Sequence, residues 1–145
     1  MNKLSIKRQA GAGLIEILIS VVVLAVGLTG IAAMQVRSVK NNVSALEHSI
    51  AVIQAQSMGD TLAISRTQAL AGNFNISLNA GDPSNTDFAP SSVKQWRTSI
   101  RSLLGDDATG SVNCVSPNCT IIVQWNNNRA TEGSATQQIR VEMHL

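Results

Sequence analysis

The side chains of this 145-residue chain that could do chemistry are few and lie far apart in the sequence. Glu16 is the only ionisable residue between Ala12 and Met34, in an otherwise apolar segment. Two cysteines, Cys114 and Cys119, stand near the C-terminus, and the chain has two histidines. No Ser/His/Asp, Cys/His or paired-carboxylate arrangement typical of catalysis can be drawn from the sequence. We therefore expect a chain that is not an enzyme and needs no cofactor.

The two cysteines favour a disulfide. In an exported chain two lone thiols this close together pair more readily than they bind metal. The bond would close a short turn between Cys114 and Cys119 and contribute about 2 kcal/mol. A metal site would need His48 and His144 to converge with the cysteines, and the sequence around Asp82 lacks the full calcium-loop pattern. We expect no metal site.

Glu16 lies where lipid would disfavour it. The apolar run from Ala12 to Met34 is long enough to cross the hydrocarbon core of a bilayer as a helix. A charge inside that core is costly and implies a partner of opposite sign. A secretory signal would have a shorter apolar core without an acid, and a plain signal-anchor would have no use for this carboxylate.

The net charge of +2 comes from a basic leader. Lys3, Lys7 and Arg8 precede Gly11, and the positive-inside rule keeps this end in the cytoplasm and the chain beyond Gln35 on the far side of the membrane. Without these three residues, eight of the 11 basic residues remain against nine acidic residues. A nearly neutral chain does not attract nucleic acid, which we exclude as a partner.

One long helix is expected over residues 12–65, because the first proline is Pro83. Its second half is amphipathic. An apolar stripe recurs there at intervals of three and four residues: Val36, Val39, Val43, Leu46, Ile50 and Ile53. We expect the stripe to pack against a head domain and the opposite face to stay in water, with Arg37, Asn41, Glu47 and Gln54. A coiled-coil dimer would show the same spacing and stays open as an alternative.

The remainder predicts a small head with a second helix and a sheet. The helix should span residues 91–104, with Ser91 or Ser92 as its cap, Trp96 in the core and Gly105 at its end. Strands are expected at residues 111–114, 119–125 and 137–143, where polar and apolar residues alternate. The polar segment after Trp125 is either a hairpin loop or a partner contact. The fold class is α+β, with a long N-terminal helix packed on a small antiparallel sheet.

The residues from Gly11 to Glu16 resemble the leader junction of the type IV pilin and pseudopilin family, whose common form is Gly followed by Phe-Thr-Leu-Ile-Glu. Four of the six positions match: Gly11, Leu14, Ile15 and Glu16. Ala12 and Gly13 depart from the usual Phe and Thr. The resemblance implies a pilin-like fold, cleavage by a prepilin peptidase after Gly11 and methylation of the new amino group on Ala12. We expect Glu16 to pair with that amino group and set subunit register.

Residues 56–72 and 119–129 are similar to parts of PilV-type minor pilins. The implied domains are a leader at 1–11, a transmembrane and assembly helix at 12–35, and a periplasmic pilin-like head at 36–145. The implied role is a minor pilin in pilus priming, assembly, motility and adhesion, located in the bacterial inner membrane and then in the pilus. Its partners would be the prepilin peptidase, other minor pilins, the major pilin and the assembly platform. The alternative is a minor pseudopilin of the I type in a type II secretion system.

Overall fold

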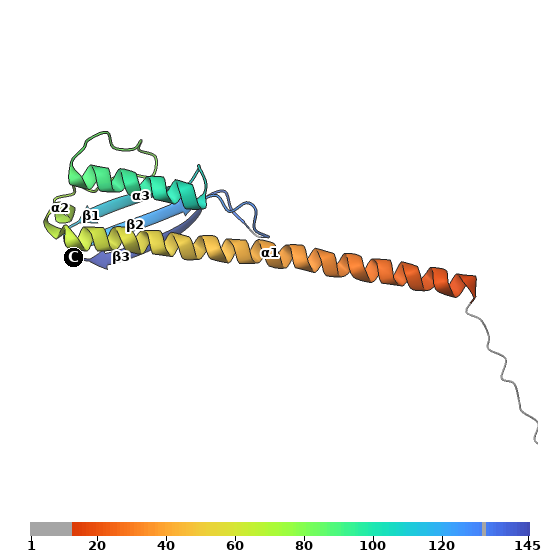
Figure 1. The fold of residues 1–145 in the computed structure, drawn as a ribbon. Helices are drawn as coiled ribbons and strands as arrows, with labels where there is room; N and C mark the ends of the chain where they lie inside the picture. The colour runs from red at the N-terminus through yellow and green to blue at the C-terminus, as the bar shows by residue number, and fades with distance from the viewer. Residues whose placement is uncertain (1–12, 132) are drawn as a thin grey trace, which may run out of the picture. The chain divides into compact units, whose positions relative to one another are not determined.

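A computed structural model describes residues 13–131 and 133–145 (Figure 1). The elements in chain order are α1 (Leu14–Ile64), α2 (Arg66–Leu70), α3 (Phe88–Leu104), β1 (Thr109–Val115), β2 (Asn118–Trp125) and β3 (Gln137–His144). The chain divides into two compact units, Met1–Ser38 and Val39–Leu145. The long helix and the three-stranded sheet confirm the predicted α+β fold.

The first unit holds the N-terminal part of α1, which is helical from Leu14 onward. Two of its hydroxyl side chains bond within the helix: Ser20 donates to the carbonyl of Ile17 at 2.7 Å, and Thr29 donates to that of Ala25 at 2.9 Å. Such bonds let a hydroxyl lie in an apolar medium. By length and composition α1 is able to cross a membrane.

The prediction that the apolar stripe of α1 packs against the head is wrong. Five residues of the apolar stripe are exposed, and Ile50 is half-buried. The buried residues of α1 form another face: Glu47, Ala51, Ala55, Met58, Gly59 and Leu62. Small residues on this face let the helix approach the sheet closely, since a Cβ on Gly59 would lie 3.4 Å from the sulfur of Met143. At this short distance, atoms of the helix contact atoms of the sheet. A row of branched residues would hold the two layers further apart.

α3 begins three residues earlier than predicted. Asp87 is its N-cap, with φ −61° and ψ 160°, so the predicted cap at Ser91 or Ser92 is wrong. Pro90 fits into the first turn because the N–H groups there have no partner inside the helix. Gly105 follows the helix as predicted, and its φ of 108° favours glycine.

The strands form one antiparallel sheet in the order β1-β2-β3. Alternate residues of β2 are buried: Cys119, Ile121, Val123 and Trp125. Figure 1 shows α3 and the second unit's part of α1 over the same sheet. On β3, Ile139, Val141 and Met143 are half-buried and pack on the core, whereas Gln138, Arg140 and Glu142 are exposed. This alternation confirms the predicted faces of the last strand.

The β1–β2 hairpin carries the predicted disulfide. Cys114 and Cys119 are bonded and lie opposite each other in the strand register. Both sulfur atoms take part in the disulfide, so neither cysteine is available as a thiolate ligand for a metal. The outer edge of β1 is covered: the Asn75 side chain exchanges two hydrogen bonds with the backbone of Cys114, at 3.2 and 2.7 Å, and Ile76 pairs with Val112. Covering this edge protects it from pairing with other chains.

Trp96 lies in the core, as predicted, with 6% of its surface exposed. Its indole N–H donates to the carbonyl of Gln54 at 2.8 Å, which joins α3 to α1. The ring lies against Gly110 of β1, where a Cβ would overlap it. Glycine at this position therefore sets how closely α3 approaches the sheet.

Candidate functional site

Glu16 lies in the first turn of α1. Its backbone N–H donates to the carbonyl of Gly13 at 2.9 Å. A carboxylate in the first turn is stabilised by the positive end of the helix dipole. Gly11 and Ala12, the predicted cleavage and methylation positions, lie outside the described residues. The predicted partner of Glu16 therefore lies outside them too.

The helix around Glu16 exposes a large aliphatic surface. Every residue from 14 to 34 is exposed, and Leu14 reaches 83%. Soluble monomers rarely expose contiguous apolar surface of this extent, whereas a bilayer core or a bundle of helices accommodates it. Gly27 and Gly30 leave room for another helix, since a Cβ on either would meet nothing within 4 Å.

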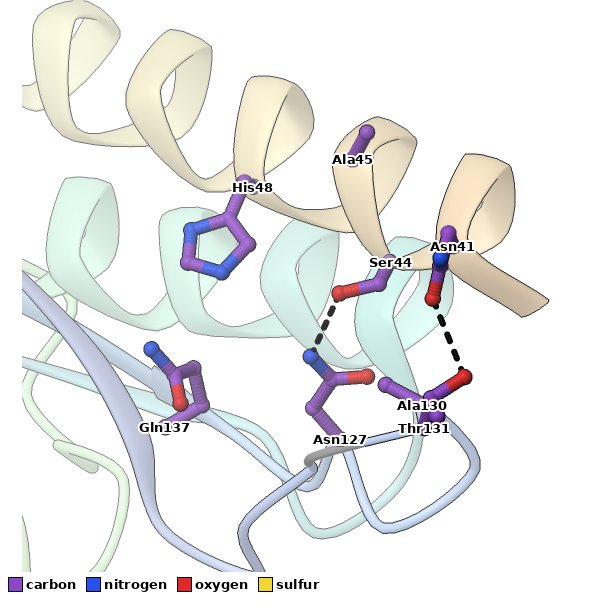
Figure 2. Close-up of a pocket in the computed structure, with 8 residues that line it drawn as sticks. All are labelled: Asn41, Ser44, Ala45, His48, Asn127, Ala130, Thr131 and Gln137. Atoms are coloured by element: carbon purple, nitrogen blue, oxygen red, sulfur yellow. Dashed lines mark hydrogen bonds between the residues drawn. The ribbon is translucent and has the colours of Figure 1, made fainter. Parts of the chain in front are cut away.

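In the second unit, a polar loop after β2 is bound to α1 by side chains (Figure 2). The Asn127 amide donates to the Ser44 hydroxyl at 2.8 Å, and the Thr131 hydroxyl donates to the side-chain oxygen Oδ1 of Asn41 at 3.0 Å. The loop after β2 therefore makes contacts within its own chain.

A third pair in the same region is an ion pair on a buried carboxylate. Arg129 donates to Glu47 Oε1 at 3.1 Å, and the Glu47 side chain is only 8% exposed, against 75% for Arg129. Glu47 Oε2 and Trp125 Nε1 are buried without a hydrogen-bond partner among the described residues. The edge of the His48 ring contacts Trp125, with centroids 4.9 Å apart. The sequence placed Glu47 in water, which is wrong.

A hollow of about 560 Å³ lies between α1 and the loop after β2 (Figure 2). It is lined by Asn41, Ser44, Ala45, His48, Asn127, Ala130, Thr131 and Gln137. The described lining residues carry mainly amides and hydroxyls. Ser44 and His48 both line the hollow, and the serine hydroxyl accepts a hydrogen bond from the Asn127 amide.

The strongest polar centre of the head is Arg97, whose side chain is 1% exposed. It donates twice to the Gly110 carbonyl, at 2.8 and 2.7 Å, and to the carbonyls of Ala80 and Ser77, at 2.7 and 2.6 Å. The guanidinium thus ties α3 to β1 and to the loop before α3. Burial lowers the pKa of Arg97, yet an arginine remains protonated.

Asp82 supplies the counter-charge for this centre. Its carboxylate lies 3.6 Å from Arg97 and accepts hydrogen bonds from Arg101. The hydrogen bond from Arg101 is the main cause that lowers the pKa of Asp82. Burial is the next largest effect and opposes it, and the positive charges of Arg101 and Arg97 lower the pKa further. The pair fixes the loop around Asp82 to α3.

Residues 6–32 match the prokaryotic N-terminal methylation motif. The match supports a type IV pilin-like family. No curated protein and no solved structure matches the chain. Proteins with the pilin motif are structural subunits, processed by prepilin peptidase and assembled into pilus-type complexes. The motif and the apolar part of α1 are consistent with membrane anchoring.

The pilin motif includes Gly11, Ala12 and Glu16, all three residues singled out from the leader junction. The structure adds two residues that the sequence analysis missed, Glu47 and Arg97. A signal for Arg97 exists, because it lies four residues after Val93 and three before Ile100, inside the apolar arc of α3. A charged residue in such an arc predicts a buried polar centre.

Proposed function

We propose that this chain is a minor pilin, a low-copy subunit that takes part in priming and assembly of a type IV pilus. The observation that carries the proposal is the exposed apolar start of α1 with Glu16 in its first turn, inside the methylation motif. A head with its own core, held on an anchoring helix, suits a subunit that is stored in the membrane and later extracted into a filament. The similarity of residues 56–72 and 119–129 to PilV-type minor pilins supports the assignment.

Processing is proposed to cut after Gly11 and to methylate the amino group of Ala12. The leader then stays in the cytoplasm, and residues 36–145 form the periplasmic head. Replacing Gly11 with Leu should leave the precursor at its full mass in a host with the peptidase, whereas the wild type loses residues 1–11. Gly27→Ala serves as a control, because a Cβ there meets nothing within 4 Å. Normal cleavage of the Gly11→Leu chain would contradict the proposed processing.

Glu16 is proposed to pair with the freed amino group of Ala12 on the same or an adjacent subunit. In a medium without water such a pair offsets the cost of each charge and fixes axial register. Glu16→Ala should insert into the membrane and be cleaved but be missing from sheared filaments, whereas Glu16→Asp should retain part of the incorporation. Equal amounts of the alanine variant and the wild type in filaments would refute the pairing.

A minor pseudopilin of the I type would use the same N-terminal segment. Deletion of the gene separates the two roles. Loss of surface pili with type II secretion intact supports the minor pilin, and loss of secretion with normal pili supports the pseudopilin. A pull-down with the full-length chain in detergent then identifies which minor pilins bind it.

A further inference from the structure

The two edges of the sheet differ in how their backbone groups are bonded. On β1, the outward-facing backbone groups bond to Asn75, Ile76 and Arg97. β3 is the other edge strand. Within residues 13–131 and 133–145, no other strand pairs with β3 and no loop backbone bonds to its outer side. One edge of the sheet is therefore covered, and the other is open.

The ladder identifies which backbone groups of β3 face outwards. In an antiparallel sheet, successive residues point their N–H and C=O alternately to one neighbour and to the other. Cys114 of β1 points these groups towards Asn75, so Cys119 opposite it points its own towards β3. Met143, the partner of Cys119 on β3, therefore bonds back to β2. By alternation, the outward-facing groups belong to Gln138, Arg140, Glu142 and His144.

This open edge has none of the features that usually block strand pairing. β3 is eight residues long, contains no proline and pairs with β2 without a bulge. Arg140 and Glu142 lie on its exposed face and form an ion pair at 3.5 Å, so neither charge points to the core side. Inward charges, prolines, bulges and covering loops are what keep natural edge strands from pairing. β3 is therefore suited to receive a further strand.

We propose that β3 binds an extended segment of a different protein chain, which adds a fourth strand to the sheet. The backbone of the segment bonds to the outward-facing N–H and C=O groups of β3. Its side chains alternate to match the two faces. On one face, apolar residues cover Ile139, Val141 and Met143, which the chain alone leaves half-buried. On the other, an acid lies opposite Arg140 and a base opposite Glu142.

The direction of β3 disfavours a second copy as the occupant. β3 runs the same way as the neighbouring part of α1, because Gln137 and His48 border one hollow and Met143 lies beside Gly59. An antiparallel pair of β3 strands would place opposite charges face to face, but it would turn the two α1 helices in opposite directions. A parallel pair would join the helix-covered face of one sheet to the exposed face of the other. Chains anchored in one membrane leave it in the same direction, so this step rests on the proposed function.

A synthetic peptide tests the open edge directly. In antiparallel register, the peptide Thr-Val-Lys-Ile-Glu-Val-Thr places its lysine opposite Glu142 and its glutamate opposite Arg140. Amide-resolved hydrogen exchange is measured on the full-length chain in detergent. The amides of these two residues should exchange fast in the free chain and lose most of that exchange with saturating peptide. The same peptide, N-methylated at its lysine and glutamate, is the control and should give no protection, because it cannot donate to β3.

A matched pair of variants separates the backbone from the side chain. The Arg140 N–H faces outwards, so Arg140→Pro removes a donor of the open edge without removing a bond to β2. It should lose the peptide's protection of Glu142, whereas Arg140→Gln should keep part of it. Tryptophan fluorescence during urea unfolding checks that both variants are folded. If Arg140→Pro fails to fold, the N-methylated peptide still decides the question with the wild-type chain.

The natural occupant is tested by photo-cross-linking in the host membrane. Benzoylphenylalanine replaces Gln138 on the open edge, or Asn113, which is exposed on the covered strand β1. The Gln138 position should cross-link to an alternating apolar and charged segment of another protein, and the Asn113 position should not. A cross-link between two β3 strands, or none that is specific to Gln138, overturns the proposed occupant.

The two proposals fail separately. No protection by the peptide, or equal protection by its N-methylated form, overturns strand addition at β3. N-terminal processing and membrane association of the same chains are measured alongside. A processed, membrane-bound chain whose β3 amides stay unprotected refutes strand addition alone, whereas a chain that is neither processed nor in the membrane refutes the proposed function.

Discussion

Arg97 places a full positive charge inside the head, where only 1% of its side chain reaches solvent. A buried charge is tolerated only when hydrogen bonds and a counter-ion replace its lost hydration. Carbonyls of three residues and the Asp82 carboxylate do so here. Glu16 is in the opposite position, because its side chain is exposed in the described structure.

Arg97→Lys should destabilise the head by about 3 kcal/mol, because an ammonium cannot reach the three carbonyls at once and leaves buried acceptors unpaired. Urea unfolding of the full-length chain in detergent, followed by tryptophan fluorescence, measures the change. Arg101→Lys is the control and should cost less than about 1 kcal/mol, since Arg101 is part-exposed. Equal losses of unfolding free energy in the two variants would mean that the burial of Arg97 does not add to its effect on stability.

Acid should weaken the head partly through Asp82. The pKa of this carboxyl is lowered in the folded chain, mainly by the hydrogen bond from Arg101. A lowered folded-state pKa contributes stability above the unfolded value of about 3.9, and this contribution is lost as the pH falls through the folded-state value. The unfolding free energy of Asp82→Asn should therefore fall less steeply than that of the wild type below about pH 4. Parallel curves for the two proteins would exclude the contribution of Asp82.

At the scale of elements, close approach decides which helix faces are buried. α1 turns Ala51, Ala55 and Gly59 towards the sheet together with Met58 and Leu62, and it leaves Val39, Val43 and Leu46 outside. α3 likewise approaches β1 through Gly110, which lies under the Trp96 ring. Packing of this kind stabilises both helices on one sheet face without a large aromatic core, and the chain has only two phenylalanines and two tryptophans.

Gly110→Ala should destabilise the head by about 1–3 kcal/mol, because its methyl group would overlap the Trp96 ring and force α3 outwards. Gly81→Ala is the matched control, since a Cβ at Gly81 meets nothing within 4 Å. Thermal unfolding by circular dichroism compares the two variants, and loss of near-ultraviolet signal from Trp96 should accompany the first. If Gly110→Ala unfolds at the same temperature as the wild type, α3 can shift without loss of stability.

At the scale of the whole molecule, the two units have different sources of stability. Among residues 13–131 and 133–145, every buried residue lies between Glu47 and Leu145, in the second unit. The described part of the first unit buries nothing, and its exposed apolar surface is consistent with membrane anchoring. Under the proposed function, the surroundings of the first unit change from bilayer to filament while the head stays folded.

A truncated chain of residues 39–145 should therefore fold without the first unit. It should unfold cooperatively in urea and no longer sediment with membranes. The comparison is with the full-length chain in detergent, whose tryptophan transition reports the same core. A truncated head without a cooperative transition would show that the first unit contributes to folding.

Local sequence patterns determined much of this protein. The uninterrupted helix, the apolar segment with Glu16, the disulfide between Cys114 and Cys119 and the alternation on β3 follow from composition, spacing and the absence of early prolines, which act over a few residues. The match of residues 6–32 to the methylation motif agrees with the resemblance seen at the leader junction. Each of these features could be predicted because it depends on neighbours in the chain.

Only the tertiary structure decided which face of α1 is buried. Two rows on that helix compete. One is the apolar stripe, and the other combines the small residues Ala51, Ala55 and Gly59 with Glu47, Met58 and Leu62. The sheet selects the second because small side chains permit a shorter distance between the layers. Glu47 and Arg97 are buried for a related reason, since their partners at Arg129 and Asp82 come from distant segments that only the fold brings together.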